Sequence, residues 1–263
     1  MFERIKDCIC HPRYLGKYNK DSFFKVFLIL FLFLCVACAM LAGRTYIEQP
    51  FDESSALEIT SKIITANVIQ ANYDSSEKRL MGDSGVVTGQ GFKLHILDEE
   101  WDKTRSSSDI LIVLNEEQAD IYVGAKLISS KKYQEIKTDS FSFEKIKDND
   151  ASSIYYFKIF ILNILNSSNL YFQTMNFLDG LISIGISYLL CLVFSYFLSL
   201  VINPTIDRNV RFRLCLYDSC VFFVGSFFAF LFNIDFISYI ALALPLLYTL
   251  ITFRHIVKVV IRR

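Results

Sequence analysis

One stretch of the chain holds residue types that could carry chemistry in water. His95, Asp98 and the serines at 106–108 are the three residue types of a Ser-His-Asp set, although no spacing fixes them as one. The run Asp98-Glu-Glu-Trp-Asp102 offers carboxylates for Ca²⁺ or a cationic partner, without the spacing of an EF-hand. Trp101 could stack on a sugar or serve as an ordinary core or interface anchor. We expect an ordinary strand histidine and a solvated acidic loop.

The cysteines give no metal or redox motif of the usual spacing. Cys8-Ile-Cys10-His11 lacks the spacing of a zinc knuckle and has no second Cys/His pair in the polar segments. Cys35-Val-Ala-Cys38 is a CxxC inside an apolar segment, where packing of small residues is the simpler interpretation. Phosphate-binding and zinc-peptidase motifs are missing, and a net charge of zero gives no field for nucleic acid. We therefore expect no catalytic residue, cofactor, metal ion or nucleic-acid partner.

The most regular polar pattern lies inside an apolar segment, Phe177–Ile202. Small or polar residues recur there at every fourth position: Asp179, Ser183, Ser187, Cys191, Ser195, Ser199 and Asn203. Residues four apart lie nearly above one another on an α-helix, and in lipid such a row lets a second helix approach closely. Each step drifts by about 40°, so the row winds around the helix instead of lining one wall. This pattern favours inclined helix packing centred on Ser187, Cys191 and Ser195 over a polar conduit.

Two acidic residues lie within the apolar segments, where ionisable side chains are the first functional candidates. Asp179 is near one end of its segment, and Asp218 is about one turn inside the next segment. Both are shallow enough to reach headgroups or water, and Asp218 could pair with Arg211 or Arg213. We expect both to be interfacial anchors, because a transport pathway would need a charge or a broken helix near the midplane.

Four apolar segments would position these residues. The composition, 53% hydrophobic and 21% charged, is too apolar for one soluble domain and too charged for a protein wholly in the membrane. Transmembrane helices are predicted at 26–43, 177–202, 214–232 and 236–253. A cleaved signal peptide is the alternative for the first, because Ala37-Cys38-Ala39 resembles a cleavage site. The long polar region before that segment favours a retained span.

Three short polar segments, 1–25, 203–213 and 254–263, set the orientation. Together they hold thirteen Lys and Arg against four Asp and Glu, whereas residues 44–176 hold fourteen against twenty. The positive-inside rule therefore puts both termini in the cytosol and 44–176 outside. Apolar residues interleaved in 1–25 predict an amphipathic segment on the membrane surface, broken at Pro12, with a solvated basic leader as the alternative.

Residues 44–176 read as one small soluble domain of mixed structure. Helical spacing predicts a helix within Glu53–Tyr73, and Ile154–Leu165 is too short to span, so it predicts a core or interfacial helix. Short β-like runs are expected at Phe92–Leu97, Ile110–Leu114 and Ala119–Val123, and Asn115–Gln118 suits a tight hairpin connection between the last two. A further strand is expected within Tyr133–Asp150. The fold class is thus an integral membrane α-helical protein of about four transmembrane helices, with a small α+β extracytoplasmic domain inserted after the first.

The leader His11-Pro-Arg-Tyr-Leu-Gly-Lys-Tyr18 and the runs Lys93–Asp98, Asp109–Leu114 and Ala119–Val123 resemble segments of a known family. That family comprises Gram-positive membrane proteins of uncharacterised activity, often described as maltodextrin-utilisation accessory proteins and defined by a domain of unknown function. The resemblance implies a basic leader, a first span, a small outer domain and a cluster of C-terminal spans. It carries over no catalytic residues, and its sugar association comes from the family's name.

Three functions follow as hypotheses. The first is a non-enzymatic integral membrane protein whose extracytoplasmic domain senses a ligand or docks a partner, as an accessory factor in carbohydrate (maltodextrin) utilisation. The alternatives are a regulatory or accessory subunit of a membrane transporter and an extracytoplasmic cell-envelope enzyme. The expected partners are the lipid bilayer and another membrane protein or transporter complex.

Overall fold

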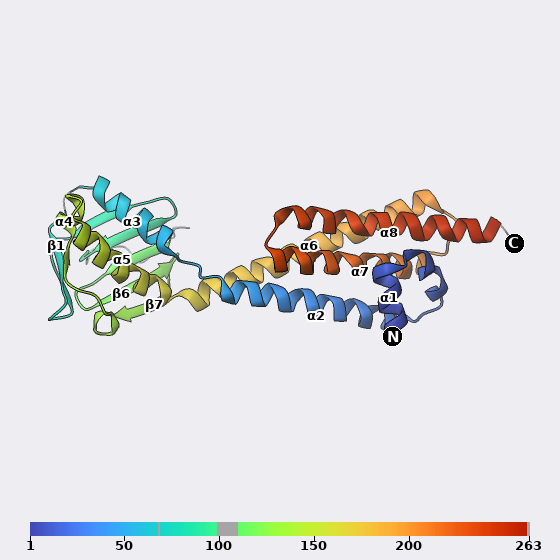
Figure 1. Ribbon diagram of the computed structural model, residues 1–263, viewed down its shortest axis with the longest axis horizontal. Helices are drawn as coiled ribbons and strands as arrows, with labels where there is room; N and C mark the ends of the chain where they lie inside the picture. The colour runs from blue at the N-terminus through green and yellow to red at the C-terminus, as the bar shows by residue number, and fades with distance from the viewer. Residues whose placement is uncertain (68, 99–109, 262–263) are drawn as a thin grey trace. The chain divides into compact units, whose positions relative to one another are not determined.

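The computed structural model describes residues 1–67, 69–98 and 110–261, and the chain divides into two compact units (Figure 1). Met1–Glu48 and Met175–Arg263 form a helical unit, and Gln49–Thr174 form a second unit, which contains the sheets and which we call the soluble unit after the prediction from sequence. The sequence predicted the soluble part as 44–176. Trp101 and the serines at 106–108 lie outside the described residues.

The helical unit contains four helices that are long and apolar enough to cross a membrane, as predicted. They are α2 (Phe23–Ile47), α6 (Asn169–Ile202), α7 (Arg208–Phe232) and α8 (Asp235–Ile261, with Pro245 inside). Each extends beyond the segment that hydropathy predicted, most of all α8 and α6. The first two turns of α6 mix polar and apolar residues and contain neither Gly nor Pro, so the helix continues where the hydropathy falls.

Helix α7 is the centre of the helical unit. In its most apolar 18-residue window 72% of the residues are buried, against 17–28% in the other three helices. The most extensive contacts between helices join α7 to α8 and to α2. At one of them, a Cβ added to Gly225 of α7 would lie 2.5 Å from the Cβ of Ala241 on α8. Among the glycines of the helical unit, the one closest to a neighbouring helix therefore lies between α7 and α8, and not along the predicted row of α6.

The N-terminal leader folds onto the ends of α7 and α8. It consists of α1 (Phe2–Cys10) and the 3-10 helix η1 (Pro12–Tyr18), separated by the predicted break before Pro12. Cys8 and Leu15 are completely buried against the bundle. The face that carries these two residues packs on the bundle, and contact of the leader with the membrane surface stays a prediction. The apolar residues of this face are covered by helices distant in the sequence, and no local pattern reveals such partners.

Two sheets make the frame of the soluble unit. One has the order β2-β1-β8, and the other has the order β3-β4-β5-β6-β7. Their strands are β1 (Ala71–Asp74), β2 (Arg79–Gly82), β3 (Gly85–Thr88), β4 (Phe92–Ile96), β5 (Ile110–Leu114), β6 (Gln118–Val123), β7 (Lys126–Lys132) and β8 (Phe141–Ser142). All pairs are antiparallel except β4 with β5. The expected hairpin joins β5 to β6, where Asn115 N donates to Gln118 O at 2.9 Å.

Helices pack on these sheets over an aromatic core. They are α3 (Glu53–Thr65), η2 (Tyr133–Glu135), α4 (Phe143–Lys147) and α5 (Ala151–Asn166). The core rings include Tyr73, Tyr133, Phe141, Phe157 and Phe160. The helix predicted within Glu53–Tyr73 ends at Thr65, because the alternating burial of Ala71, Asn72 and Tyr73 belongs to β1. The core helix expected at Ile154–Leu165 is α5.

Candidate functional site

The four-spaced row of α6 crosses from the surface into the bundle. Ser183 is exposed and Ser187 is half-buried, whereas Cys191, Ser195 and Ser199 are buried. Earlier in α6 the buried positions are instead Ile184 and Tyr188, one residue later in each turn. A row of residues four apart winds gradually around a helix of 3.6 residues per turn. The row therefore reaches the buried face of α6 only from Cys191 onward.

Only part of this row makes polar contacts with another helix. Cys191 Sγ donates to Leu242 O of α8 at 3.5 Å. Ser199 Oγ bonds within its own helix, and Ser195 Oγ has no hydrogen-bond partner among the described residues. A further link comes from outside the row, where the hydroxyls of Tyr188 and Ser219 of α7 lie 3.1 Å apart. The packing role of the row remains a prediction.

Asp218 is completely buried, so the expectation that it reaches headgroups or water is wrong. Its Oδ1 lies 2.7 Å from Thr252 Oγ1 of α8. Its Oδ2 and the Oγ1 of Thr249, one turn before Thr252, are buried without hydrogen-bond partners within the described part of the chain. Arg211 and Arg213 do not bond to it, because their guanidinium groups donate to backbone carbonyls.

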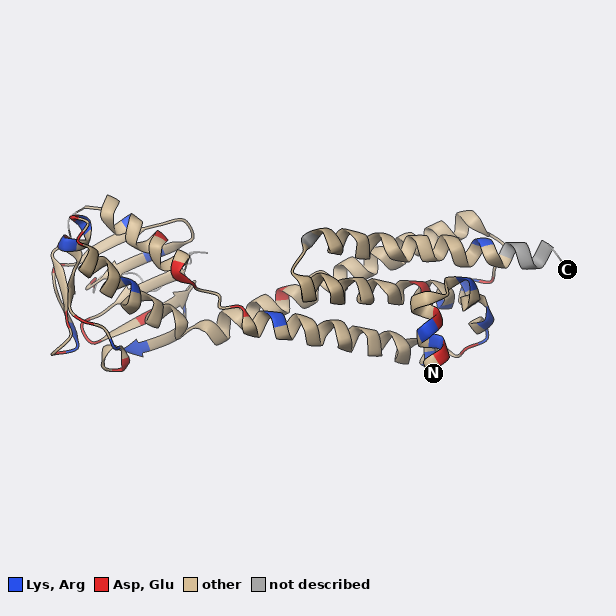
Figure 2. Ribbon diagram, in the orientation of Figure 1, with Lys and Arg blue, Asp and Glu red and all other residues tan. Residues whose placement is uncertain are grey.

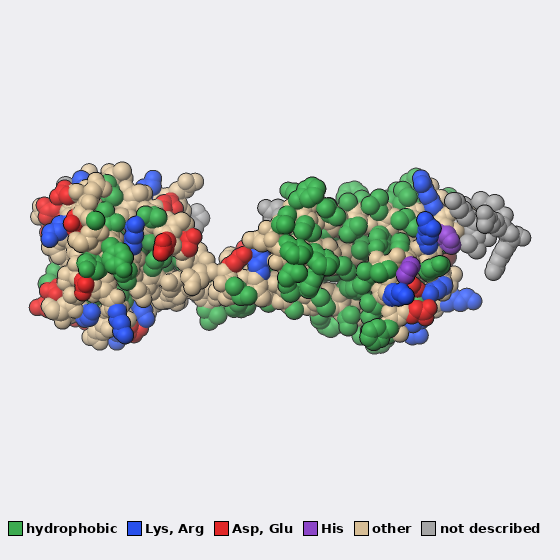
Figure 3. Space-filling model, in the orientation of Figure 1, with side chains coloured by type: hydrophobic (Ala, Val, Ile, Leu, Met, Phe, Trp, Pro, Cys, Tyr) green, Lys and Arg blue, Asp and Glu red, His purple; other side chains and the backbone are tan. Residues whose placement is uncertain are grey.

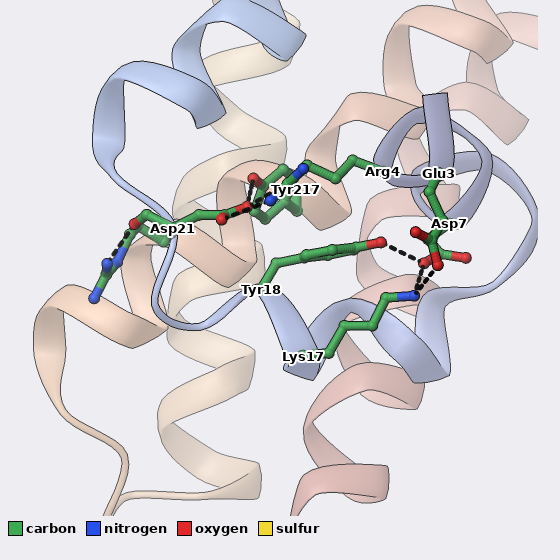
Figure 4. A network of polar contacts seen from close by, with 8 residues as sticks. Glu3, Arg4, Asp7, Lys17, Tyr18, Asp21 and Tyr217 are labelled. Atoms are coloured by element: carbon green, nitrogen blue, oxygen red, sulfur yellow. Dashed lines mark hydrogen bonds and ion pairs between the residues drawn. The ribbon is translucent and has the colours of Figure 1, made fainter. Parts of the chain in front are cut away.

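A network of charged and aromatic side chains holds the leader to α7 (Figure 4). The Asp21 carboxylate accepts two hydrogen bonds from Arg4, at 2.7 and 3.0 Å, and one from Tyr217 Oη of α7 at 2.7 Å. The bonds from Arg4 hold the pKa of Asp21 below its usual value, against the opposing effect of burial. Asp21 is therefore an ionised link between α1, the start of α2 and α7.

Asp7 forms the second centre of this network. Its Oδ2 accepts from Tyr18 Oη and from Lys17 Nζ, both at 2.7 Å. Burial favours the neutral carboxyl, yet the bonds from Lys17 and Tyr18 outweigh it and lower the pKa of Asp7. The Arg4 guanidinium and the Lys17 ammonium lie 5.0 and 4.9 Å from the centre of the Tyr18 ring.

Backbone carbonyls of the leader are also satisfied by the bundle. Tyr248 Oη of α8 donates to Ile9 O, and Thr252 Oγ1 lies 2.9 Å from Pro12 O. Ile9 lies in the last turn of α1, where carbonyls lack helical partners, whereas Pro12 is the first residue of η1. Sequence reasoning missed these contacts, although Tyr248 and Thr252, four apart in an apolar segment, were a signal for a polar row facing a partner.

The soluble unit contains an open cleft of about 720 Å³. It is lined by β2, by Leu97 and Asp98 after β4, and by the hairpin residues Asn115–Gln118. Arg79 of β2 forms an ion pair with Glu117 across it. Among the described lining residues, the acidic side chains are Asp98, Glu116 and Glu117, and the one basic side chain is Arg79. The lining therefore has more acidic than basic groups, an acidic surplus.

A histidine and a carboxylate meet at the edge of this cleft. His95 Nδ1 lies 2.7 Å from Asp98 Oδ2, and both side chains are largely buried. The structure thus brings together two members of the Ser-His-Asp set. Within the described ranges, no three His, Cys, Asp or Glu side chains gather as a metal site. Asp179 is exposed on α6.

Charged side chains are sparse along the middle of the four long helices and gather where the leader packs (Figure 2). The space-filling view shows the helical unit covered by apolar side chains on the face in view (Figure 3). Exposed Ile, Leu, Val and Phe side chains belong to each of the four helices. A bilayer would cover such a surface.

No family model, no curated protein and no solved structure matches this chain. The resemblance to the maltodextrin-utilisation accessory proteins therefore stays a prediction. Four apolar helices indicate a multi-pass membrane protein.

Proposed function

We propose that this chain is a non-enzymatic multi-pass membrane protein whose soluble unit binds a polar ligand or a partner protein outside the cell. The observation that carries the proposal is the cleft between β2 and the β5–β6 hairpin. Its volume of about 720 Å³ falls within the range of ligand sites, roughly 300–1,000 Å³. The helical unit would then serve as anchor and as the surface for a membrane partner.

The chemistry of the cleft narrows the ligand class. Carboxylates, one guanidinium and the Asn115 amide are the groups that hydrogen-bond hydroxyls, and the acidic surplus also suits cations. A maltooligosaccharide fits the first class and agrees with the accessory role in maltodextrin utilisation that the family resemblance implies. A polyamine fits the second.

The placement of the basic segments supports the proposed topology. The leader packs on α7 and α8, and Arg213 Nη1 donates to Asp21 O at 2.5 Å, so the loop before α7 lies beside the leader. Both chain ends lie at this same end of the bundle (Figure 1). Three positively charged segments on one side are what the positive-inside rule requires of the cytosolic side.

The test is ligand binding by the full chain in lipid nanodiscs. Maltose to maltotetraose, spermidine and a buffer blank would be compared by thermal shift and calorimetry. We expect one class to raise the unfolding temperature, and Glu117→Gln to weaken that binding at least tenfold. Glu58→Gln, an exposed glutamate on α3, is the matched control and should change nothing. The proposal would be contradicted if neither the maltooligosaccharides nor spermidine bind and no protein co-purifies from native membranes.

The contact between His95 and Asp98 favours one second candidate, an extracytoplasmic hydrolytic enzyme. A carboxylate at 2.7 Å orients an imidazole as a general base requires. Hydrolysis of cell-envelope glycans or esters that is abolished by His95→Gln, with unchanged thermal unfolding, would favour the enzyme over the binding protein.

A further inference from the structure

An apolar groove lies between α6 and α7, close to the end of the bundle where these two helices are joined. Its volume is about 420 Å³. Leu192, Val193 and Phe197 of α6 and Phe212 of α7 form its apolar walls. Because these residues belong to two helices that are candidates to cross a membrane, the groove would open toward lipid acyl chains.

The groove ends at positive charge. Arg208 and Asn209, in the first turn of α7, line it at the end nearest the loop. Arg208 is exposed and forms no ion pair with any residue that the structure describes. An arginine side chain is long enough to lay its stem along apolar walls and hold its guanidinium at headgroup depth.

A second, buried cation lies behind the same wall. Arg211, three residues after Arg208 and so on the same face of α7, is 4% exposed. Its guanidinium carbon lies 5.9 Å from the centre of the Tyr196 ring, and Tyr196 also lines the groove. Its Nη2 donates to Asn203 O at 2.9 Å and to Pro204 O at 3.1 Å. Its Nε is buried without a hydrogen-bond partner in the described residues.

No carboxylate of the loop neutralises this pair of arginines. The loop's one acid, Asp207, caps α7 by accepting from Asn209 N at 2.9 Å and Val210 N at 3.4 Å. A buried guanidinium bonded only to neutral carbonyls keeps its full charge in a poorly solvated place. An anion bound in the groove would offset the positive charge of the two arginines.

We propose that this groove binds one anionic phospholipid, with an acyl chain along the apolar walls and the phosphate at Arg208, in the field of Arg211. Basic pockets between transmembrane helices bind acidic headgroups in this way. The apolar walls select a lipid over a soluble phosphate, and the two arginines select an anionic lipid over a zwitterionic one. The inference rests on the proposed membrane insertion and is independent of the ligand of the soluble unit.

The experiment uses the full chain in detergent, titrated with phosphatidylglycerol or with phosphatidylcholine of the same acyl chains. Lipids retained are counted by native mass spectrometry, and unfolding is followed by thermal shift. We expect one phosphatidylglycerol to be retained preferentially and to raise the unfolding temperature. Arg208→Gln should weaken it about fivefold, since one arginine near the surface contributes about 1 kcal/mol to the binding of anionic lipid.

Two further variants separate the parts of the site. Val193→Trp fills the groove from an exposed position and should reduce retention while leaving Arg208 in place. Arg254→Gln, an exposed arginine of α8 outside the groove, should leave retention unchanged. Equal retention of both lipids, an equal loss with Arg254→Gln, or equal stabilisation by soluble glycerol phosphate would each overturn the proposal.

Discussion

Thr252 Oγ1 and Asp218 Oδ1 lie 2.7 Å apart, and the same Oγ1 lies 2.9 Å from Pro12 O. A hydroxyl has one hydrogen to donate, whereas a carbonyl and an ionised carboxylate only accept. Thr252 is placed to donate to both oxygens, so its one hydrogen is either shared between them or, where the Asp218 carboxyl is protonated and donates to Thr252, given to Pro12 alone. Asp218, Thr252 and Pro12 O therefore join α7, α8 and the leader in one set of polar contacts.

This hydrogen count separates two substitutions. Asp218→Asn keeps a donor for Thr252, so it should change the free energy of unfolding by less than about 0.5 kcal/mol. Thr252→Val leaves Pro12 O and Asp218 without their shared partner, which should cost about 1–3 kcal/mol. Unfolding in detergent measures both. Thr45→Val, whose hydroxyl bonds only within α2, is the control. A large loss with Asp218→Asn would show an ionised carboxyl.

Acidification should loosen the leader. The pKa values of Asp7 and Asp21 are lowered in the folded protein, so their contribution to stability is complete above the unfolded value of about 3.9 and is lost as pH falls through the folded values. Hydrogen exchange of residues 1–22, corrected for intrinsic rates, should rise below about pH 4. Peptides of α5 serve as the internal reference. Protection that does not change between pH 6 and pH 3 would contradict this network.

Gly225 marks the tightest contact between α7 and α8. Gly225→Ala should destabilise the bundle by about 1–3 kcal/mol, because its Cβ would overlap that of Ala241. Ala241→Gly in the same chain should restore only part of the loss, because the Cα of residue 241 would still lie 2.8 Å from the new Cβ. Gly185→Ala has open space and should be neutral or stabilising by about 0.5–1 kcal/mol. Thermal unfolding in one detergent compares all three.

The row on α6 can be tested at its two ends. Ser195 is completely buried, so Ser195→Leu should overpack the bundle and cost about 1–3 kcal/mol. Ser183 is exposed, so Ser183→Leu should leave the unfolding temperature unchanged. Equal tolerance of both substitutions would remove the support for packing along this row.

The aromatic core should decide the stability of the soluble unit. The Phe160 ring lies 4.9, 5.0 and 5.1 Å from the rings of Tyr73, Tyr133 and Phe141. Phe160→Ala should cost about 3–5 kcal/mol of unfolding free energy. Tyr155→Ala, on the exposed side of α5, is the control and should cost little. Proteolysis of residues 49–174 in the full chain gives the readout, and equal resistance of the two variants would contradict the assignment.

Some of this architecture follows from local sequence. A segment that is apolar for about 20 residues must satisfy its own backbone hydrogen bonds in lipid, so hydropathy alone predicts a helix. For the same reason, hydropathy misplaces the start of α6, whose first turns are helical but only partly apolar. The strand Ile110–Leu114 was predicted with the observed bounds because turn residues enclose its β-branched run.

The sequence by itself thus determined the four long helices, the mixed soluble unit between the first and second, and the break before Pro12. Only the tertiary structure decided that Asp218 is buried and that the leader packs on the bundle. Tyr217 and Asp21 are 196 residues apart, and Thr252 and Pro12 are 240 apart. Periodicity reports which face of a helix is apolar or polar. Periodicity cannot report which distant segment packs on that face. That packing decides whether a polar side chain is exposed to water or is buried and bonded to another segment.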